Sequence, residues 1–450
     1  MDYFLGIDLG TSYFKAGIFD ASGRLMGLGR QYVHKISDGT TCELPIDVFW
    51  KTIRDCLDEA IQKAGVTGND IQSVSYSSQA NSFILLDINS NPLTPLILWP
   101  DKRAINFDFP ISDGFCKRTG LGIIPNHEFT IAKLYWFQKK QPYLWERTAY
   151  ILSISDYLVF ALTGQKICDY GTAFMTGLFD QTETMWWTQQ LECLNIKREK
   201  LPIPERSGVK IGALTSHGAQ LLGLSASALF CLGGLDHHMA AVGAGIPFSR
   251  NICESTGTVL ACVNYVNGYF PREEVCIAPG FHENEYFQMT FDDNSAVTLE
   301  WYQRTHAPEY TISQLLEMAT FVPSGCDGLT ALSCASKYSG LSGFRTTKNI
   351  AYHHGYYTRA ILESISRSLE GLIQKLKKEP LSAIIPTGGG GRSTLLIKIK
   401  AEKLGVNFWI PECTESACLG AALTAAAGIK NFGTLNDIIK SWVRIKHTQD

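Results

Sequence analysis

The chain opens with apolar runs that are interrupted by one short polar turn. The segment 4–10 has an apolar run that ends at Asp8, and the turn Gly10-Thr11-Ser12 separates it from a second run at 15–20. Short β-rich runs on either side of small turn residues are typical of paired strands. We therefore predict a β-hairpin with Gly10-Thr11-Ser12 at its tip.

Apolar residues at helical spacing follow this hairpin. Pro45 precedes the amphipathic stretch and Gly65 stops it, so a helix is predicted between them. Its apolar stripe consists of Phe49, Ile53, Leu57, Ala60 and Ile61.

The second half of the chain repeats this order. Residues 251–254 lead into the turn Ser255–Thr258, and the apolar residues 259–263 follow. Further on, an amphipathic helix is predicted from about Tyr357 to Lys378, and Pro380 ends it. Its apolar stripe consists of Ile361, Leu362, Ile365, Leu369, Leu372, Ile373 and Leu376.

The chain length agrees with this repeated organisation. At the usual domain size, 450 residues favour roughly two or three domains. We place the boundary near Gly245-Ile246-Pro247, which predicts an N-terminal domain at 1–247 and a C-terminal domain at 248–450. Residues 201–212 are predicted to form a surface connection.

Composition narrows the class of protein. The chain is 45% hydrophobic and 18% charged, which can fill sizeable cores and argues against disorder. Its 40 basic and 43 acidic residues give a net charge of -3, so no basic excess indicates nucleic acid. The N-terminus does not resemble a signal peptide, and no run of about 18 apolar residues would span a membrane.

The thirteen cysteines indicate where the protein resides. Their number is odd, no CxxC pair occurs, and most have apolar neighbours, so we interpret them as reduced core residues. These features together favour a cytoplasmic α/β enzyme.

The common phosphate-binding and hydrolytic motifs are absent. No Gly is followed by Lys, so there is no Walker A loop, and G-x-G-x-x-G, H-E-x-x-H and G-x-S-x-G do not occur. A phosphate-handling protein of this kind needs a different cradle.

The first predicted hairpin turn can supply one. Gly10 permits a tight turn, backbone N–H groups form an anion nest, and the Thr11 and Ser12 hydroxyls add donors. Asp8, at the strand end, can hold Mg²⁺ through water. The turn Thr256-Gly257-Thr258 repeats this chemistry. The alternative for each is an ordinary hairpin turn with a polar tip.

Two small-residue segments follow in the second half. A strand at 384–387 runs into Gly388–Gly391, where a glycine backbone lets a flat or charged ligand approach; the alternative is a flexible loop. Residues 415–428 predict a helix of small residues that packs tightly against a neighbour.

Asp236 follows an apolar run and two glycines. A carboxylate at such a loop edge can accept a proton from a substrate hydroxyl, although it can equally be the N-cap of a helix from His238 to Gly243. His237 and His238 lack a third partner at metal-ligand spacing.

The segment Trp99–Arg103 combines an aromatic residue, an acid and a base. This set suits a sugar, because a ring face stacks on Trp99 while Asp101 and Arg103 hold hydroxyls. The alternative is a surface turn with an Asp–Arg pair.

Taken together and in this order, the motifs resemble the FGGY carbohydrate kinases of the actin-like ATPase superfamily. The resemblance covers nearly the whole chain, and the first loop is most similar to the xylulokinase form. The matching blocks are residues 6–20, 77–104, 156–164, 169–180, 233–245, 255–258, 359–369, 388–405 and 415–428. The resemblance implies an α/β fold with two ribonuclease-H-like domains and a nucleotide and sugar cleft between them.

The resemblance also implies roles for individual residues. Asp236 would be the general base, and Asp8 would be the magnesium-associated acid. The residues that would bind ATP are Gly10, Thr11, Ser12, Thr256, Gly257, Thr258, Gly388, Gly389, Gly390 and Ser393. The residues that would line the sugar pocket are Gln79, Asn81, Trp99, Asp101, Arg103, Asp236 and His237.

The predicted reaction is ATP-dependent phosphorylation of a small sugar, favouring a ketopentose such as xylulose or ribulose. Ala80-Asn81 stands where xylulokinases have Met-His, and His237 stands where many members have Gln. Both differences lie in the predicted sugar pocket, so the resemblance does not fix which acceptor is phosphorylated. The alternatives are a polyol such as glycerol or erythritol, an aldonate such as gluconate held by Arg103, or a non-catalytic sugar and nucleotide sensor. Family members are often dimers, which implies a possible homodimer.

Overall fold

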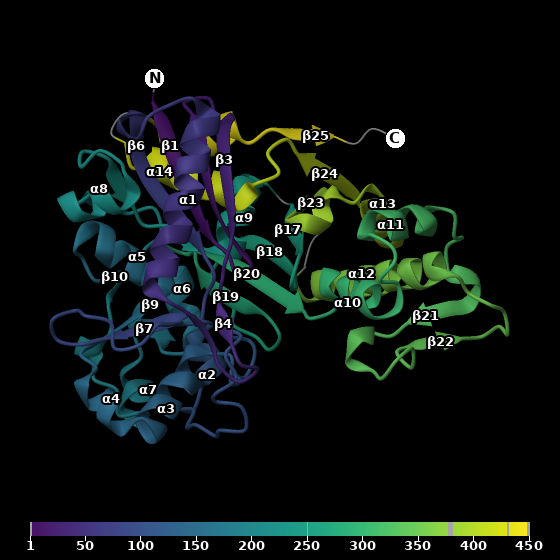
Figure 1. Ribbon diagram of the computed structural model, residues 1–450, viewed down its shortest axis with the longest axis horizontal. Helices are drawn as coiled ribbons and strands as arrows, with labels where there is room; N and C mark the ends of the chain where they lie inside the picture. The colour runs from purple at the N-terminus through teal and green to yellow at the C-terminus, as the bar shows by residue number, and fades with distance from the viewer. Residues whose placement is uncertain (1, 250, 377–380, 430–431, 448–450) are drawn as a thin grey trace. The chain divides into compact units, whose positions relative to one another are not determined.

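The computed structural model describes residues 2–249, 251–376, 381–429 and 432–447 (Figure 1). The chain divides into two compact units. The first unit consists of Met1–Phe248, Tyr265–Gln288 and Glu415–Val443, and the second of Ser249–Asn264, Met289–Thr414 and Arg444–Asp450. These units are discontinuous in sequence, whereas the predicted domains, 1–247 and 248–450, are continuous. The predicted boundary near residue 247 stays a prediction.

The main sheet of the first unit begins with the predicted hairpin. β1 (Tyr3–Leu9) pairs antiparallel with β2 (Tyr13–Asp20) in a register that joins Leu9 to Phe14, so the hairpin with its turn at Gly10–Ser12 is confirmed. The strand order is β14-β15-β6-β1-β2-β3, and β16 also pairs with β6. The other strands are β3 (Leu25–Tyr32), β6 (Ile71–Ser78), β14 (Lys210–Ala213), β15 (Leu229–Cys231) and β16 (Gly234–Leu235).

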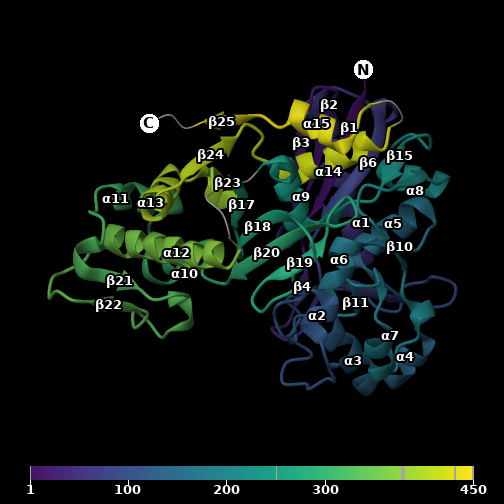
Figure 2. The same cartoon turned by 180° about the vertical axis from the view of Figure 1, so that it is seen from behind.

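Helices from distant parts of the chain cover the two faces of this sheet. α1 (Ile46–Ala64) packs on β2 and β3, whereas α14 (Ser416–Ala427) packs on β1 and β6. Figure 2 shows α14 on the face that is turned away in Figure 1. α1 lies between Pro45 and Gly65, whose φ of 68° ends the helix as predicted.

Glycine lets α14 approach its neighbours closely. A Cβ at Gly6 of β1 would overlap the carbonyl oxygen of Cys418, and a Cβ at Gly420 would overlap that of Met239 in α9 (Asp236–Gly243). Backbone therefore packs directly on backbone at these two positions. This confirms the predicted tight packing of the small-residue helix.

A smaller sheet lies elsewhere in the first unit, with the order β4-β5-β8-β7-β9. Its strands are β4 (Ile36–Ser37), β5 (Cys42–Leu44), β8 (Leu96–Ile97), β7 (Phe83–Leu86) and β9 (Tyr150–Ser153). The other elements of this unit are α2 (Phe115–Thr119), α3 (Thr130–Lys140), α4 (Pro142–Arg147), α5 (Ile154–Thr163), β10 (Ile167–Asp169), α6 (Tyr170–Met175), β11 (Phe179–Asp180), β12 (Met185–Trp186), α7 (Thr188–Cys193), β13 (Ile203–Glu205), α8 (Ser216–Leu222), β19 (Cys276–Pro279) and α15 (Leu435–Trp442).

The predicted surface connection at 201–212 is wrong in part. β13 lies within it and pairs in parallel with β10, and the side chain of Pro204 is buried. β14 also begins inside this range, at Lys210, and pairs antiparallel with β15. Strand pairing thus fixes two parts of the segment that was predicted to be a surface connection.

The second unit repeats the strand order of the first sheet. The sheet that contains its strands has the order β19-β20-β18-β17-β23-β24-β25, and β17 pairs antiparallel with β18 and in parallel with β23. By residue number, β19 and parts of β18 and β20 fall in the segment Tyr265–Gln288 of the first unit. The strands are β17 (Ile252–Thr256), β18 (Leu260–Asn267), β20 (Glu285–Asp292), β23 (Ala383–Thr387), β24 (Asn407–Pro411) and β25 (Ile445–His447), with β21 (Leu329–Ala331) and β22 (Phe344–Thr346) in a separate hairpin. The order β20-β18-β17-β23-β24 matches β3-β2-β1-β6-β15, as a duplicated ribonuclease-H-like fold requires.

Four longer helices belong to this unit: α10 (Ala296–His306), α11 (Ile312–Thr320), α12 (His354–Leu376) and α13 (Thr394–Leu404). α12 is the predicted amphipathic helix, and its whole apolar stripe is buried. It begins three residues earlier than predicted, at His354. Lys378 and Pro380 lie outside the described residues.

Most of the cysteines lie in these cores, and the structure joins none of the thirteen in a disulfide. Within the part of the chain that the structure describes, no helix is long and apolar enough to cross a membrane.

The close contact between α14 and α9 predicts that one added methyl group lowers the stability of the protein. We expect Gly420→Ala to lower the free energy of unfolding by about 1–3 kcal/mol, because the added Cβ pushes α14 away from α9. Gly371→Ala is the matched control, since a Cβ at this α12 glycine meets nothing within 4 Å. It should stabilise the chain by about 0.5–1 kcal/mol, the helix-propensity difference. Urea unfolding followed by circular dichroism measures both, and equal stabilities would contradict the packing argument.

Candidate active site

Three strands of the first unit end at the same edge of its main sheet. β6 pairs in parallel with both β1 and β16, and its last residue, Ser78, lies opposite Leu9 and Leu235. The residues that directly follow these strands are therefore brought together: the turn Gly10–Ser12, Gln79 and Asp236. Ligands of open α/β sheets bind at the carboxyl ends of parallel strands.

Hydrogen bonds tie two of these strand ends to each other. The backbone N–H of Gln79 donates to the carbonyl of Leu9 over 3.1 Å, and its side-chain Nε2 donates to the carbonyl of Gly10 over 3.2 Å. Gln79 Oε1 accepts from the Ser82 hydroxyl. Both polar atoms of the Gln79 side chain thus hold loops in place.

A buried charge cluster surrounds Asp8. Its Oδ1 accepts a hydrogen bond of 2.8 Å from the Ser77 hydroxyl, and its Oδ2 lies 3.6 Å from Nζ of Lys15. Lys15 also lies 2.9 Å from the carboxylate of Glu415, which comes from the loop before α14. Burial raises the pKa of Asp8, the Lys15 ammonium opposes this, and the carboxylates of Asp236 and Glu415 add to it.

Lys15 and Glu415 were not predicted as site residues. Burial by itself would lower the pKa of Lys15, but Asp8 and Glu415 together raise it above its usual range. The ammonium therefore stays protonated and balances the two acids. Lys15 is a charged residue inside a strand whose other interior residues are buried, which is the signal that sequence reasoning passed over.

Asp236 is the first residue of α9 and directly follows β16. Its Oδ1 accepts from the backbone N–H of His237 over 2.8 Å, and the side chain is partly exposed. The alternative of an N-cap is wrong, because Leu235 occupies the N-cap position. A carboxylate fixed by one oxygen at a strand end has its other oxygen available to accept a proton.

The two neighbouring histidines differ in their surroundings. His237 is partly exposed beside Asp236, whereas His238 is buried and stacks on Phe287 at 4.3 Å between ring centroids. Burial lowers the pKa of His238 to about 3, and His237 adds to this. His238 is therefore a neutral packing residue.

Trp99 and Asn81 contact the turn Gly10–Ser12 and α3, respectively. The Trp99 indole Nε1 donates to the Thr11 hydroxyl over 2.7 Å. Asn81 has a left-handed backbone with φ of 60°, and its Oδ1 accepts from the backbone and hydroxyl of Thr130, at 2.9 and 3.1 Å. Ser12 is exposed at the tip of the turn.

Asp101 and Arg103 form a nearly enclosed ion pair. Asp101 accepts from Nε and Nη2 of Arg103, at 2.7 and 2.9 Å, and from the backbone N–H of Cys42 at 2.7 Å. The Arg103 guanidinium also pairs with Glu43. The Asp–Arg pair thus exists, but the alternative of a surface turn is wrong, because Asp101 is fully buried and the Arg103 side chain is 8% exposed.

The second unit brings its two predicted nucleotide loops together. Cβ atoms at Gly388 and Gly390 would press against Ser255 and Thr256, respectively. Gly389 starts a short 3₁₀ helix that runs to Arg392, rather than a flexible loop. The Ser393 hydroxyl accepts from the backbone N–H of Leu396 and caps α13.

The turn after β17 is only partly available to a ligand. The Thr256 hydroxyl is buried, donates to Glu254 over 2.9 Å and accepts from Lys400 over 2.7 Å. Gly257 has open space around its Cα, and Thr258 is exposed. The geometry therefore favours Gly257 and Thr258 over the Thr256 side chain as phosphate contacts.

A cavity of about 360 Å³ lies between α12 and α13 and contains none of the predicted site residues. Its lining consists of Ser324, Arg359, Glu363, Ser366, Arg367, Ile399, Glu402 and Lys403.

Comparison with known proteins shows the family to which the chain belongs. Residues 3–243 match the N-terminal domain model of the FGGY family of carbohydrate kinases, and residues 340–429 match its C-terminal domain model. The chain belongs to the FGGY family of carbohydrate kinases. The protein is therefore an enzyme, a sugar kinase for which the family implies ATP as co-substrate.

Relatives and solved structures agree over nearly the full chain. A xylulose kinase of Bacillus subtilis (strain 168) is 26% identical, with 99% of this chain and 92% of the relative covered. Xylulose kinase and gluconate kinase structures from Lactobacillus acidophilus are each 21% identical, with TM-scores of 0.85 and 0.84, and each covers 100% of this chain and 94% of its own. A Plasmodium falciparum glycerol kinase with ADP is 18% identical with a TM-score of 0.84, at the same coverage. These matches confirm the predicted α/β fold of two actin-like ATPase domains.

The buried ion pair of Lys400 and Glu254 lies beside the turn after β17, and we expect its disruption to lower the stability of the protein. Lys400 Nζ lies 2.8 Å from the Glu254 carboxylate, and both side chains are fully buried. We expect Lys400→Met to lower the free energy of unfolding by about 3–5 kcal/mol, because it leaves a buried carboxylate without its cation. Urea unfolding measures this loss.

Lys398→Met is the matched control, since Lys398 lies on the same helix but is 73% exposed. It should leave stability nearly unchanged, and the double variant Glu254→Gln with Lys400→Met should recover part of the loss. Equal stability of the two lysine variants would contradict this assignment.

Proposed function

We propose that this FGGY kinase transfers the γ-phosphoryl group of ATP to a hydroxyl of a ketopentose such as xylulose or ribulose. The observation that supports the proposal is the meeting of Asp236, Gln79 and the turn Gly10–Ser12 at one sheet edge. A base for the hydroxyl and a cradle for phosphate thus lie at neighbouring strand ends. The full-length similarity to the Bacillus subtilis xylulose kinase supports a ketopentose as acceptor.

Asp236 acts as the general base. Its Oδ1 is held by the backbone N–H of His237, which directs Oδ2 to the acceptor hydroxyl. The proton moves to this oxygen as the hydroxyl attacks the γ-phosphorus in line. Phosphoryl transfer otherwise depends mainly on positioning and on neutralising charge.

The first turn supplies donors for the phosphates. Because the indole N–H of Trp99 can only donate, Thr11 Oγ1 accepts that bond and its own proton is free for a phosphate oxygen. Backbone N–H groups of the turn and the Ser12 hydroxyl add to the cradle. In the second unit, Gly257 and Thr258 with Gly388–Gly390 serve the nucleotide in the same way.

Magnesium fits beside the turn Gly10–Ser12 if phosphates and water supply most of its ligands. No group of three metal-ligating side chains occurs among the described residues, and Asp8 alone provides a carboxylate at the end of β1. Such a donor set suits an ion held mainly by phosphates and water. When bound with ATP, Mg²⁺ neutralises phosphate charge, and Asp8 would hold it there.

The paired cations of the first unit favour a neutral acceptor over an aldonate. Arg103 is neutralised by Asp101 and Glu43, and Lys15 by Asp8 and Glu415. A substrate carboxylate would therefore find no unpaired positive charge on these two side chains.

The retention of both Asp8 and Asp236 argues against a sensor without catalysis.

We expect turnover of a ketopentose in the presence of Mg²⁺ and ATP. The measurement follows ADP release by the purified protein across ketoses, aldoses, polyols and aldonates. If only glycerol or erythritol is phosphorylated, the acceptor is a polyol and the proposal of a ketopentose is wrong. Turnover restricted to gluconate would contradict the charge argument.

Asp236→Asn should lower kcat at least about a hundredfold, because an amide cannot accept the hydroxyl proton. ATP binding, measured by calorimetry, should remain. Asp47→Asn is the matched control, because Asp47 also lies in the first turn of a helix but is exposed. Turnover near the control level in Asp236→Asn would remove Asp236 as the base.

A further inference from the structure

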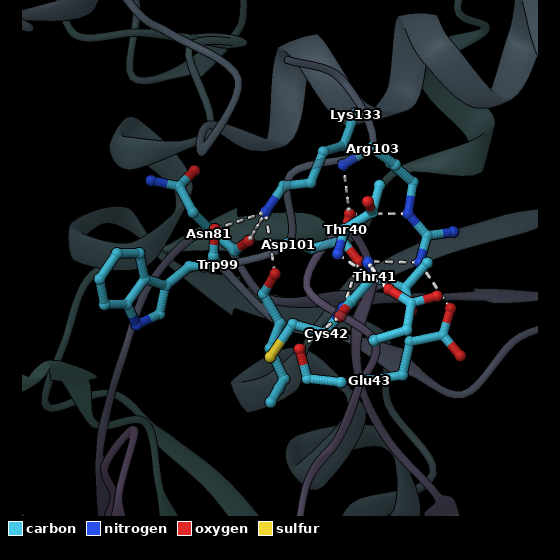
Figure 3. Close-up of polar contacts among 12 residues, drawn as sticks. Thr40, Thr41, Cys42, Glu43, Asn81, Trp99, Asp101, Arg103 and Lys133 are labelled. Atoms are coloured by element: carbon cyan, nitrogen blue, oxygen red, sulfur yellow. Dashed lines mark hydrogen bonds and ion pairs between the residues drawn. The ribbon is translucent and has the colours of Figure 1, made fainter.

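Lys133 of α3 is a fully buried cation that binds three backbone carbonyls (Figure 3). Its Nζ donates to the carbonyl oxygens of Asn81, Leu98 and Trp99, at 3.0, 3.1 and 3.2 Å. Two of these residues are predicted to contact the sugar. An ammonium has three N–H donors, so this geometry uses all of them.

α3 fixes both the backbone and the side chain of Asn81. Lys133 holds its carbonyl, and Thr130, one turn earlier in the helix, donates twice to its Oδ1. Because a backbone N–H can only donate, the amide oxygen faces Thr130 and the Nδ2 group is directed elsewhere. Asn81 also has φ of 60°, a left-handed conformation that surrounding contacts must hold in place.

Trp99 is held in a similar way from two sides. Lys133 binds its carbonyl, and the indole Nε1 donates to the Thr11 hydroxyl. The ammonium of Lys133 therefore links the Asn81 loop, the end of the Leu98–Trp99 segment and, through the indole, the turn Gly10–Ser12.

The charge of Lys133 depends on its surroundings. Burial lowers its pKa to about 7, the carboxylates of Asp101 and Glu128 oppose this, Arg103 lowers it further, and Cys42 raises it slightly. Above this pH the amine has two N–H donors for three carbonyls, so one buried acceptor loses its partner.

We propose that Lys133 is a positioning residue of the acceptor site, which directs the Asn81 amide and the Trp99 ring toward the sugar without touching it. This inference rests on the proposed function and adds a residue to its site. Lys133 binds the backbone of both residues but reaches the turn Gly10–Ser12 only through the Trp99 indole, so its loss should change acceptor affinity more than the affinity for ATP.

The test compares Lys133→Met with Lys139→Met, an exposed lysine of the same helix. Steady-state kinetics are measured for wild type and both variants, with acceptor and ATP varied separately. We expect the acceptor KM of Lys133→Met to rise about tenfold or more, the effect of losing one charged hydrogen bond, and the ATP KM to stay within about twofold. Lys139→Met should match wild type.

The pH profile provides a second readout that does not need the variant to fold. The acceptor KM of the wild type should rise as pH increases through about 7, because deprotonation removes one donor. This rise should be absent in Lys133→Met. Lys133→Gln, which keeps two N–H donors, should lie between wild type and Lys133→Met.

The outcomes separate the inference from the proposed function. A wild-type enzyme that phosphorylates no acceptor would overturn the proposed function, and this inference with it. An active wild type with an acceptor KM independent of pH, or a folded Lys133→Met with unchanged acceptor KM, would overturn the inference alone. A loss of kcat with both KM values unchanged would assign Lys133 a purely structural role.

Discussion

The parallel pairing of β6 with both β1 and β16 is the constraint on which the first unit depends. Side chains alternate along a strand, so a shift of one residue would turn Asp8 and its neighbours to the other face. The observed register instead places the ends of three strands together, although Leu9 and Leu235 lie far apart in the sequence. Each polar residue that follows a strand end is then carried to the same edge by main-chain hydrogen bonding alone. The chemistry of the site is therefore a consequence of the sheet register.

Much of this fold could be predicted from local pattern. Both strand–turn–strand units, the helix that ends at Gly65 and the apolar stripe of α12 follow from periodicity and turn residues. The same patterns place Asp8 at the end of a strand and Asp236 after an apolar run. Gln79 was named only through the family resemblance, which also supplied the roles of all three residues, and these roles stay predictions. Local pattern failed at 201–212, where a pairing with the distant β10 decides the conformation. It also failed at the start of α9, where Leu235 rather than Asp236 takes the N-cap position.

The buried charges could not be predicted, because nothing near them in the sequence indicates their partners. Lys133 binds a carbonyl 52 residues away, and Lys400 pairs with a carboxylate 146 residues away. Lysine is rarely fully buried, so the sequence alone predicts an exposed helix residue at each of these positions. Burying a charge is costly unless every donor finds an acceptor. In this chain Lys133 meets that condition with three carbonyls, and Lys400 is paired with Glu254 and bonded to Thr256. Both lysines lie beside predicted ligand-binding loops, whose geometry therefore depends on buried interactions.

The discontinuity of the first unit has a consequence for how the protein is made. Its sheet is formed from residues near the N-terminus, but α14, which covers one face, comes from near the C-terminus. At a synthesis rate of about 5–20 residues per second, the ribosome needs roughly 10–40 s after residue 248 to produce the segment that includes α14. During this interval the face formed by Gly6 and its neighbours is uncovered in the nascent chain. The kinase therefore completes its first unit only after α14 has been synthesised, and until then one face of the sheet lacks the helix that covers it.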